Sequence, residues 1–179
     1  SGISKSPSVF DYDKLSWFNG EYIRAMSVEE FTEAAMPYYK KVFGDKQMPY
    51  EKFAEILQKR TTQLTQIPEM IDFFAELPEY SKDLFVNKKS KTNFENAPVV
   101  LKEAYERLKA MSVWDNQSIH DCLINMAVEK ELKNGTVMWP VRIAAAGKTV
   151  TPGGAVEILD ILGREESLQR LEKGLAKFN

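Results

Sequence analysis

Apolar residues recur every three or four positions along most of the chain, which is the spacing that places them on one face of an α-helix. No stretch shows the strict alternation of a half-buried β-strand over a useful length. The pattern therefore predicts an all-α fold. The expected helices cover residues 11–25, a segment starting at Ser27, and residues 50–67, 68–77, 96–111, 116–132, 151–162 and 165–177. Residues 136–146 suit either an extended segment or a short buried helix.

Capping residues set the expected ends of several helices. Ser27 and Glu30 have the spacing of a capping box at a helix start. Thr151 followed by Pro152 predicts another start, with threonine as the N-cap and proline in the first turn. The Asn134–Gly135 pair is expected to end a helix, because both residues tolerate the left-handed conformation found there.

A polar stretch interrupts the periodicity in the middle of the chain. We expect a linker over residues 87–95 that joins two helical subdomains, residues 11–86 and 96–179. Residues 1–10 are expected to form an extended lead-in. Because the sequence starts with Ser1–Gly2 and has no initiator methionine, we interpret it as a piece of a longer protein, with vector-derived residues at the front.

Composition narrows the classes of function. The formal net charge is −2, from 24 basic and 26 acidic residues, which is not the strongly basic balance of a non-specific nucleic-acid binder. Any nucleic-acid site must therefore be local. No apolar run approaches the ~20 residues that span a bilayer. The single cysteine, Cys122, cannot form an internal disulfide, and together with the single His120 it argues against a structural zinc site.

Residues 133–156 depart from this balance, because they contain three basic residues and no acidic one. Glycines in this segment let a ligand approach the backbone closely. The helix start expected at Thr151 offers free N–H groups and a positive dipole end. Arg142 nearby can donate two hydrogen bonds to a base edge or stack on a base, as in the recognition of single-stranded RNA loops. The alternative is a buried connector with an ordinary N-cap.

Other candidate features have stronger structural interpretations. Tyr38–Tyr39 and Phe73–Phe74 could stack on bases, but their helical spacing favours core packing. The lysines of residues 88–91 could contact phosphates or lie in a solvated linker. No phosphate-binding loop, dinucleotide fingerprint or H-E-x-x-H motif is present in the sequence. His120 and Cys122 lie two positions apart, so they do not share a helix face.

Two regions resemble a known family. The segments W-P-V-R-I-A-A-A-G-K (139–148), T-P-G-G-A (151–155) and E-I-L-D-I-L-G (157–163) are similar to the C-terminal signature of glutamyl-tRNA synthetases. S-P-S-V-F-D (6–11) and K-L-S-W-F-N-G-E-Y-I-R (14–24) resemble the junction after the family's stem-contact region. The resemblance covers essentially the whole chain, and its two ends are its specific parts.

This resemblance implies an all-α cage of two helical subdomains that receives the anticodon loop of a glutamate-accepting tRNA. It places the arginine of the W-P-x-R segment and the T-P-G turn against anticodon bases, and a helix arginine near the third base. We expect a lysine of the same region to contact a phosphate or ribose. The implied site residues are Arg142, Thr151, Pro152, Gly153, Gly154, Lys148 and Arg60.

The same resemblance implies that the parent enzyme attaches glutamate to tRNA with ATP and Mg²⁺. Ser4-Lys5-Ser6 resembles the ATP-binding K-M-S-K-S loop, but it lies too close to Phe10 and is interpreted as a local lead-in. With no H-I-G-H motif, the chain alone is expected to be inactive and to bind no cofactor or metal. We expect a cytoplasmic monomer without a membrane or DNA partner.

Two other functions stay open from the residues. One is a helical protein-interaction module that binds no nucleic acid. The other is a free-standing enzyme that uses His120 or the carboxylates. The sequence also leaves open whether the parent charges glutamine tRNA as well.

Overall fold

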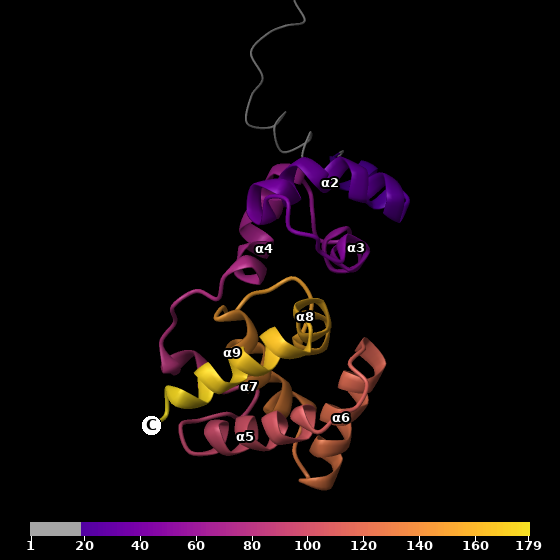
Figure 1. Cartoon of the computed structure of the whole chain (residues 1–179). Helices are drawn as coiled ribbons and strands as arrows, with labels where there is room; N and C mark the ends of the chain where they lie inside the picture. Colours follow the sequence, from indigo (N-terminus) through magenta and orange to yellow (C-terminus); the bar gives the residue numbers. More distant parts are fainter. Residues whose placement is uncertain (1–18) are drawn as a thin grey trace, which may run out of the picture. The chain divides into compact units, whose positions relative to one another are not determined.

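A computed structural model of the chain describes residues 19–179, which are helical except for turns and one isolated bridge between Asn87 and Thr92 (Figure 1). The predicted all-α fold is confirmed. The chain divides into two compact units, which meet in sequence between Asp72 and Phe73. The predicted lead-in, residues 1–10, lies outside the described residues.

The boundary between the two units differs from the predicted linker. Residues 87–95 lie inside the second unit, where backbone hydrogen bonds join Asn87 and Thr92 in both directions, at 3.1 and 3.0 Å. The buried Thr92 hydroxyl donates to the carbonyl of Phe85 at 2.7 Å. These side-chain and backbone bonds order the polar stretch as a tight turn, although it carries no apolar periodicity.

The first unit contains helical residues 19–25, α2 (Val28–Phe43), α3 (Tyr50–Leu57), η2 (Leu64–Gln66) and the start of α4 (Ile67–Ala75). The predicted capping box begins α2: Glu30 N–H donates to Ser27 Oγ at 3.1 Å, and Ser27 N–H donates to Glu30 Oε1 at 2.9 Å. Tyr39 is fully buried and stacks on Tyr50 at 5.0 Å between ring centroids. Core packing therefore accounts for Tyr39, whereas its neighbour Tyr38 is half-buried.

The predicted continuous helix over residues 50–67 is wrong, because α3 ends at Leu57. The Thr61 hydroxyl donates back to the carbonyl of Leu57 at 2.7 Å, a local bond that competes with helix propagation. Gln66 Oε1 then accepts from the backbone N–H groups of Thr62 and Gln63, which caps the next helical turn. Local hydrogen bonds of the polar side chains of Thr61 and Gln66 thus accompany the division of the segment into α3, η2 and α4.

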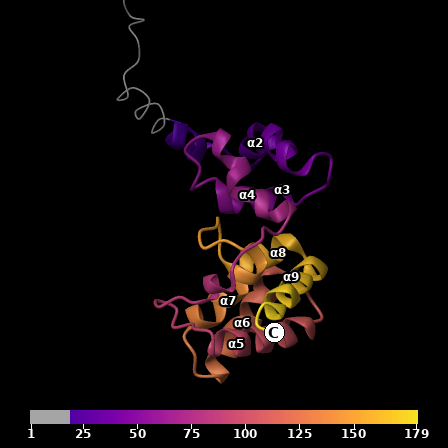
Figure 2. The same ribbon diagram turned by 90° about the vertical axis from the view of Figure 1, so that its left-hand side faces the viewer.

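The second unit is built around α7 (Asn134–Ala146). This helix packs against α5 (Asn96–Lys109), α6 (Asn116–Glu129), α8 (Ala155–Leu162) and α9 (Arg164–Ala176), as the two views show (Figures 1 and 2). A further short helix, η3 (Lys82–Phe85), also contacts α7. Because most residues of α7 are buried, its apolar positions surround the helix instead of forming one stripe.

The sequence predicts that Asn134–Gly135 ends a helix. In the structure this pair begins α7 instead. The preceding helix, α6, ends earlier because Glu131 adopts a positive φ of 54°. The N–H of Leu132 then donates to the carbonyl of Ala127 at 2.9 Å, the long bond of a Schellman cap. A glutamate therefore occupies the left-handed position that the sequence pattern assigns to glycine, and the ambiguous residues 136–146 are helical.

Arg170 of α9 joins the ends of two other helices inside this unit. Its side chain is only 1% exposed, and Nη1 donates to the carbonyls of Phe73 in α4 and Ala145 in α7, at 2.8 and 2.7 Å. Nε donates to Glu166 at 2.7 Å. The carbonyls near a helix C-terminus have no intrahelical partner, so Arg170 satisfies groups that would otherwise be buried unpaired.

Candidate nucleic-acid interface

The connection between α7 and α8 carries most of the predicted site residues. The C-cap of α7 is Gly147, which adopts the left-handed conformation with φ of 65°. A Cβ at this position would lie 3.0 Å from side-chain atoms of Pro78 and Tyr80, so the site requires glycine for space as well as for conformation.

The predicted helix start at Thr151–Pro152 is wrong in register. α8 begins at Ala155, and its N-cap is Gly154. The φ of Gly153 is 78°, which a helix cannot continue through, so Thr151 and Pro152 lie in the turn before the helix. A capping pair three residues downstream replaces the predicted one: Gly154 N–H donates to Glu157 Oε1 at 2.8 Å.

Arg142 is fixed on three sides. Its Nη1 donates to Thr151 Oγ1 and its Nη2 donates to the carbonyl of Thr149, both at 2.8 Å. The guanidinium carbon lies 4.9 Å from the ring centroid of Trp139, one turn earlier on α7. The indole of Trp139 is itself anchored, because Nε1 donates to the carbonyl of Leu84 at 2.9 Å. Burial lowers the pKa of Arg142, but a guanidinium stays charged at neutral pH.

The Thr151 hydroxyl forms hydrogen bonds within the protein, to Arg142 and to the turn before α8. It accepts from Arg142 and donates to the carbonyl of Gly153 at 3.0 Å. Thr151 is also nearly buried, whereas Gly153 and Gly154 are partly exposed. The threonine therefore orients the arginine, and the glycines leave room beside it.

A pocket of about 300 Å³ lies beside Arg142, and we call it the α7–α8 pocket. Residues of α7, of the start of α8 and of the turn around Ser90 line it. They are Ser90, Gly135, Met138, Trp139, Arg142, Gly154, Ala155, Val156 and Glu157. Two of these residues carry charges of opposite sign, Arg142 and Glu157. The pocket therefore offers hydrogen-bond donors, a carboxylate acceptor and an aromatic ring.

Sequence reasoning missed both Trp139 as a support for the arginine and Glu157 as part of the site. The signal for Trp139 is its position three residues before Arg142, which places both on one helix face. Glu157 follows directly after the acid-free segment and stands three residues after Gly154, the spacing of a capping pair. Because the predicted N-cap was Thr151, the three-residue spacing between Gly154 and Glu157 was not interpreted as a capping pair.

The remaining predicted residues lie elsewhere. Lys148 follows the C-cap of α7, is half-buried, and places its ammonium 5.6 Å from the ring centroid of Phe73. Arg60 belongs to the first unit, where it is exposed in the turn after α3. The structure thus brings Arg142 and the turn of residues 151–154 together, with Lys148 in the same connection.

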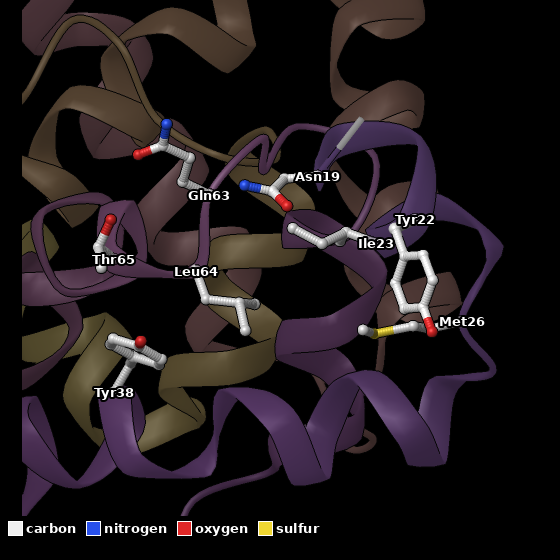
Figure 3. Close-up of a pocket in the computed structure, with 8 residues that line it drawn as sticks. All are labelled: Asn19, Tyr22, Ile23, Met26, Tyr38, Gln63, Leu64 and Thr65. Atoms are coloured by element: carbon white, nitrogen blue, oxygen red, sulfur yellow. The ribbon is translucent and has the colours of Figure 1, made fainter. Parts of the chain in front are cut away.

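A second pocket of about 300 Å³ lies within the first unit (Figure 3). In Figure 3 the side chain of Leu64 lies between the rings of Tyr22 and Tyr38, and the amides of Asn19 and Gln63 lie at one edge. The described residues that line this pocket carry no charged side chain. It therefore lacks the cation that would attract a phosphate or fix a base edge.

His120, which the alternative enzyme hypothesis uses, and the single Cys122 both lie on α6. His120 is exposed on α6, where Nδ1 lies 3.3 Å from Asp121 Oδ1. Burial raises the pKa of the Cys122 thiol, which disfavours the nucleophilic thiolate. Across residues 19–179, histidine, cysteine, aspartate and glutamate side chains form no cluster of three or more that could hold a metal ion. Within the same residues, none of the helices has the length and apolar character needed to cross a bilayer.

Comparison with known proteins is consistent with this geometry. Residues 30–175 match the family described as anticodon binding domain. The chain is 51% identical over 176 residues to the glutamate–tRNA ligase of Clostridium tetani, which covers 98% of this chain and 36% of that protein. It is 48% identical over 176 residues to the glutamate–tRNA ligase of Clostridium kluyveri, with the same coverage. The chain thus spans about a third of the length of these curated relatives.

The fold is also found in solved structures. A crystal structure of a glutamate tRNA ligase from Elizabethkingia meningosepticum, in complex with its amino acid, superposes with a TM-score of 0.76. The sequences are 24% identical, and the match covers 93% of this chain and 32% of that one. This likeness supports the fold, and the family match extends over most of the described residues of both units. The chain therefore belongs to the anticodon binding domain family.

Proposed function

We propose that this chain is the anticodon-loop binding module of a glutamate–tRNA ligase. The observation that carries the proposal is Arg142, which is fixed by Thr151 and Thr149 and lies over the ring of Trp139 in the lining of the α7–α8 pocket. It lies in the part of the chain that matches the anticodon binding domain family. Unpaired bases of an RNA loop are recognised by such arginine planes and base-edge hydrogen bonds.

Each predicted residue of the connection between α7 and α8, and Arg142 beside it, has a distinct task in this proposal. Two of the five N–H donors of Arg142 bond within the protein, which leaves others for a base edge. Thr151 fixes the direction of these donors. Pro152 stiffens the turn, and Gly153 and Gly154 let a nucleotide approach the backbone. Lys148 contacts a phosphate or ribose next to the base.

The activity of the longer protein belongs to the same proposal. The curated relatives are glutamate–tRNA ligases about three times the length of this chain. The longer protein would attach glutamate to its tRNA with ATP and Mg²⁺, in a part outside this sequence. The module described here would supply tRNA recognition and no catalytic residue.

Binding of the chain to an anticodon stem-loop of glutamate tRNA tests the proposal. Affinity is measured at low and moderate salt against the same stem-loop with changed anticodon bases. We expect binding that weakens with salt, because phosphate contacts release counterions, and that weakens further with the changed bases. Equal binding of both loops would contradict anticodon recognition. Absence of binding at both salt concentrations would favour a helical module for protein partners.

A further inference from the structure

The turn of residues 87–92 carries three lysines, and it lies against the start of α7. The Thr136 hydroxyl donates to the carbonyl of Ser90 at 2.7 Å, across 46 positions of sequence. A Cβ on Gly135 would lie 3.8 Å from the Cα of Ser90, so the two backbones are close together. The turn thus adds its lysines to the one that precedes α7. We call these four residues the lysine cluster: Lys88, Lys89, Lys91 and Lys133.

Hydrogen bonds hold the turn in one conformation. Asn87 Oδ1 accepts from Ser90 N–H at 2.7 Å, and Asn96 Nδ2 donates to the carbonyl of Lys91 at 2.8 Å. Lys91 adopts a positive φ of 58°, a conformation that favours glycine or asparagine over lysine. In a flexible linker the like charges could move apart. This turn instead keeps its lysines together.

No acidic side chain balances the charge of the lysine cluster. Residues 84–94 and 132–156 contain no aspartate or glutamate, and the nearest acids along the chain are Glu95 and Glu131. Within residues 19–179, no lysine of the cluster forms an ion pair. All four lysines are exposed. Such a group of unpaired surface cations attracts a polyanion.

The accessible face of α7 leads from the lysine cluster into the α7–α8 pocket. Beyond Asn134, the residues of α7 that are not buried are spaced three or four positions apart, which places them on one helix face: Gly135, Met138, Trp139 and Arg142. All of them line the pocket, and so does Ser90 of the lysine-bearing turn. A strand of RNA that places a base in this pocket would therefore have the lysine cluster beside it.

We infer that the lysine cluster binds the phosphates of the RNA strand whose base enters the α7–α8 pocket, and so positions this strand along α7. The inference rests on the proposed function, because it takes the pocket as the place where a base enters. A lysine ammonium binds phosphate as a compact charge and reads no base. An acidic protein segment would also be attracted, but the adjacent pocket with Arg142 and Trp139 favours a ligand that has bases as well as phosphates.

The first test removes two exposed lysines of the cluster by combining Lys88→Ala with Lys89→Ala. The matched control combines Lys102→Ala with Lys173→Ala, which removes the same charge from exposed positions of α5 and α9 in the same unit, outside the pocket lining. Affinities for anticodon stem-loops are measured over a series of salt concentrations. Thermal unfolding of each variant is compared first.

We expect the Lys88 and Lys89 variant to bind every stem-loop more weakly by a similar factor, because phosphate contacts carry no base information. Its slope of log affinity against log salt concentration should decrease by about 1.4 to 2, since two phosphate contacts are lost. The Lys102 and Lys173 variant should keep the wild-type slope. Arginine at both positions 88 and 89 should keep it as well, because the contact needs positive charge.

A change in the RNA makes the test independent of protein folding. A methylphosphonate linkage removes the negative charge of one phosphate and is placed at each loop position in turn. The wild type should lose affinity when the neutral linkage lies next to the base that enters the pocket. The Lys88 and Lys89 variant should lose much less at the same linkage, as a double-mutant cycle requires.

The outcomes separate this inference from the proposed function. An unchanged salt slope in the Lys88 and Lys89 variant, or an equal decrease in the Lys102 and Lys173 control, would overturn the role of the lysine cluster alone. A loss that depends on the anticodon bases, or no linkage at which wild type and variant differ, would overturn it too. No binding of any stem-loop by the wild type would overturn the proposed function itself.

Discussion

At the scale of single residues, the site depends on side chains that fix other side chains. Trp139 and Thr151 set the direction of Arg142, and Gly154 sets the position of Glu157. The sequence predicted the arginine and the turn, because their types and spacing are recognisable. It did not predict these supporting contacts, which depend on the register of α8 and on the packing of α7.

Arg142→Ala is expected to weaken binding of an anticodon stem-loop by about 1–3 kcal/mol, because it removes base-edge donors and a stacking plane. Arg164 is a matched control, since it also covers a tryptophan ring, Trp114 at 6.0 Å, and donates to a carbonyl, that of Met111 at 2.6 Å. Arg164 does not line the α7–α8 pocket. Arg164→Ala should lower thermal stability without changing the relative affinities for different loops. Unchanged affinity in Arg142→Ala would exclude its proposed role.

Lys148→Ala should weaken binding by a similar factor for every anticodon sequence, because a phosphate or ribose contact carries no base information. The slope of log affinity against log salt concentration should decrease by about one. Lys109 serves as the control, because its ammonium also lies over an aromatic ring, that of Tyr105 at 5.6 Å, but on α5. A sequence-dependent loss in Lys148→Ala would argue for a base contact instead.

At the scale of helices, periodicity predicted which segments are helical, but local hydrogen bonds decided where they end. The ends of α3 and α6 depend on the Thr61 hydroxyl and on a left-handed Glu131, and neither follows from hydrophobic spacing. Arg170 was not recognised either, because a charged residue between Leu168 and Leu171 is typical of an exposed helix edge. Its burial is explained only by carbonyls from Phe73 and Ala145, which are distant in sequence.

Gly174→Ala should destabilise the chain by about 1–2 kcal/mol in thermal or denaturant unfolding. A Cβ at this position would lie 2.9 Å from the Cβ of Ala144, so α7 and α9 would have to separate. This cost exceeds the gain in helix propensity of up to ~1 kcal/mol. Gly135→Ala is the control, because the nearest atom to its Cβ would lie 3.6 Å away, in Ser90. A Gly174→Ala variant as stable as the control would contradict the close packing of the two helices.

At the scale of the whole molecule, the all-α fold and the family followed from the sequence, whereas the position of the boundary between the two units did not. The predicted linker carries polar residues, but Asn87 and Thr92 order it within the second unit. The boundary instead falls inside α4, where the sequence shows an uninterrupted apolar helix. The family match includes residues of both units, so we expect both to contribute to RNA binding.

Arg60→Ala tests the contribution of the first unit. If Arg60 contacts the third anticodon base, the variant should bind the cognate loop about 1–3 kcal/mol more weakly and discriminate less at that position. The effect on loops changed at the other two positions should be small. Lys59→Ala is the control, because Lys59 is the adjacent exposed cation in the same turn. Equal effects of the two variants would show that only positive charge matters there.

The fixing of Arg142 by hydrogen bonds to the loop of residues 149–151 has a further consequence for the thermodynamics of binding. A free arginine side chain loses up to ~2 kcal/mol of rotamer entropy when a ligand immobilises it. Here the loop of residues 149–151 has already restricted that motion before any RNA arrives. Ordering of the Arg142 side chain therefore adds little to the entropic cost of association, because this side chain is already ordered in the free protein. Mutations that loosen the loop should then act through faster dissociation of RNA, even when every atom that touches the base is retained.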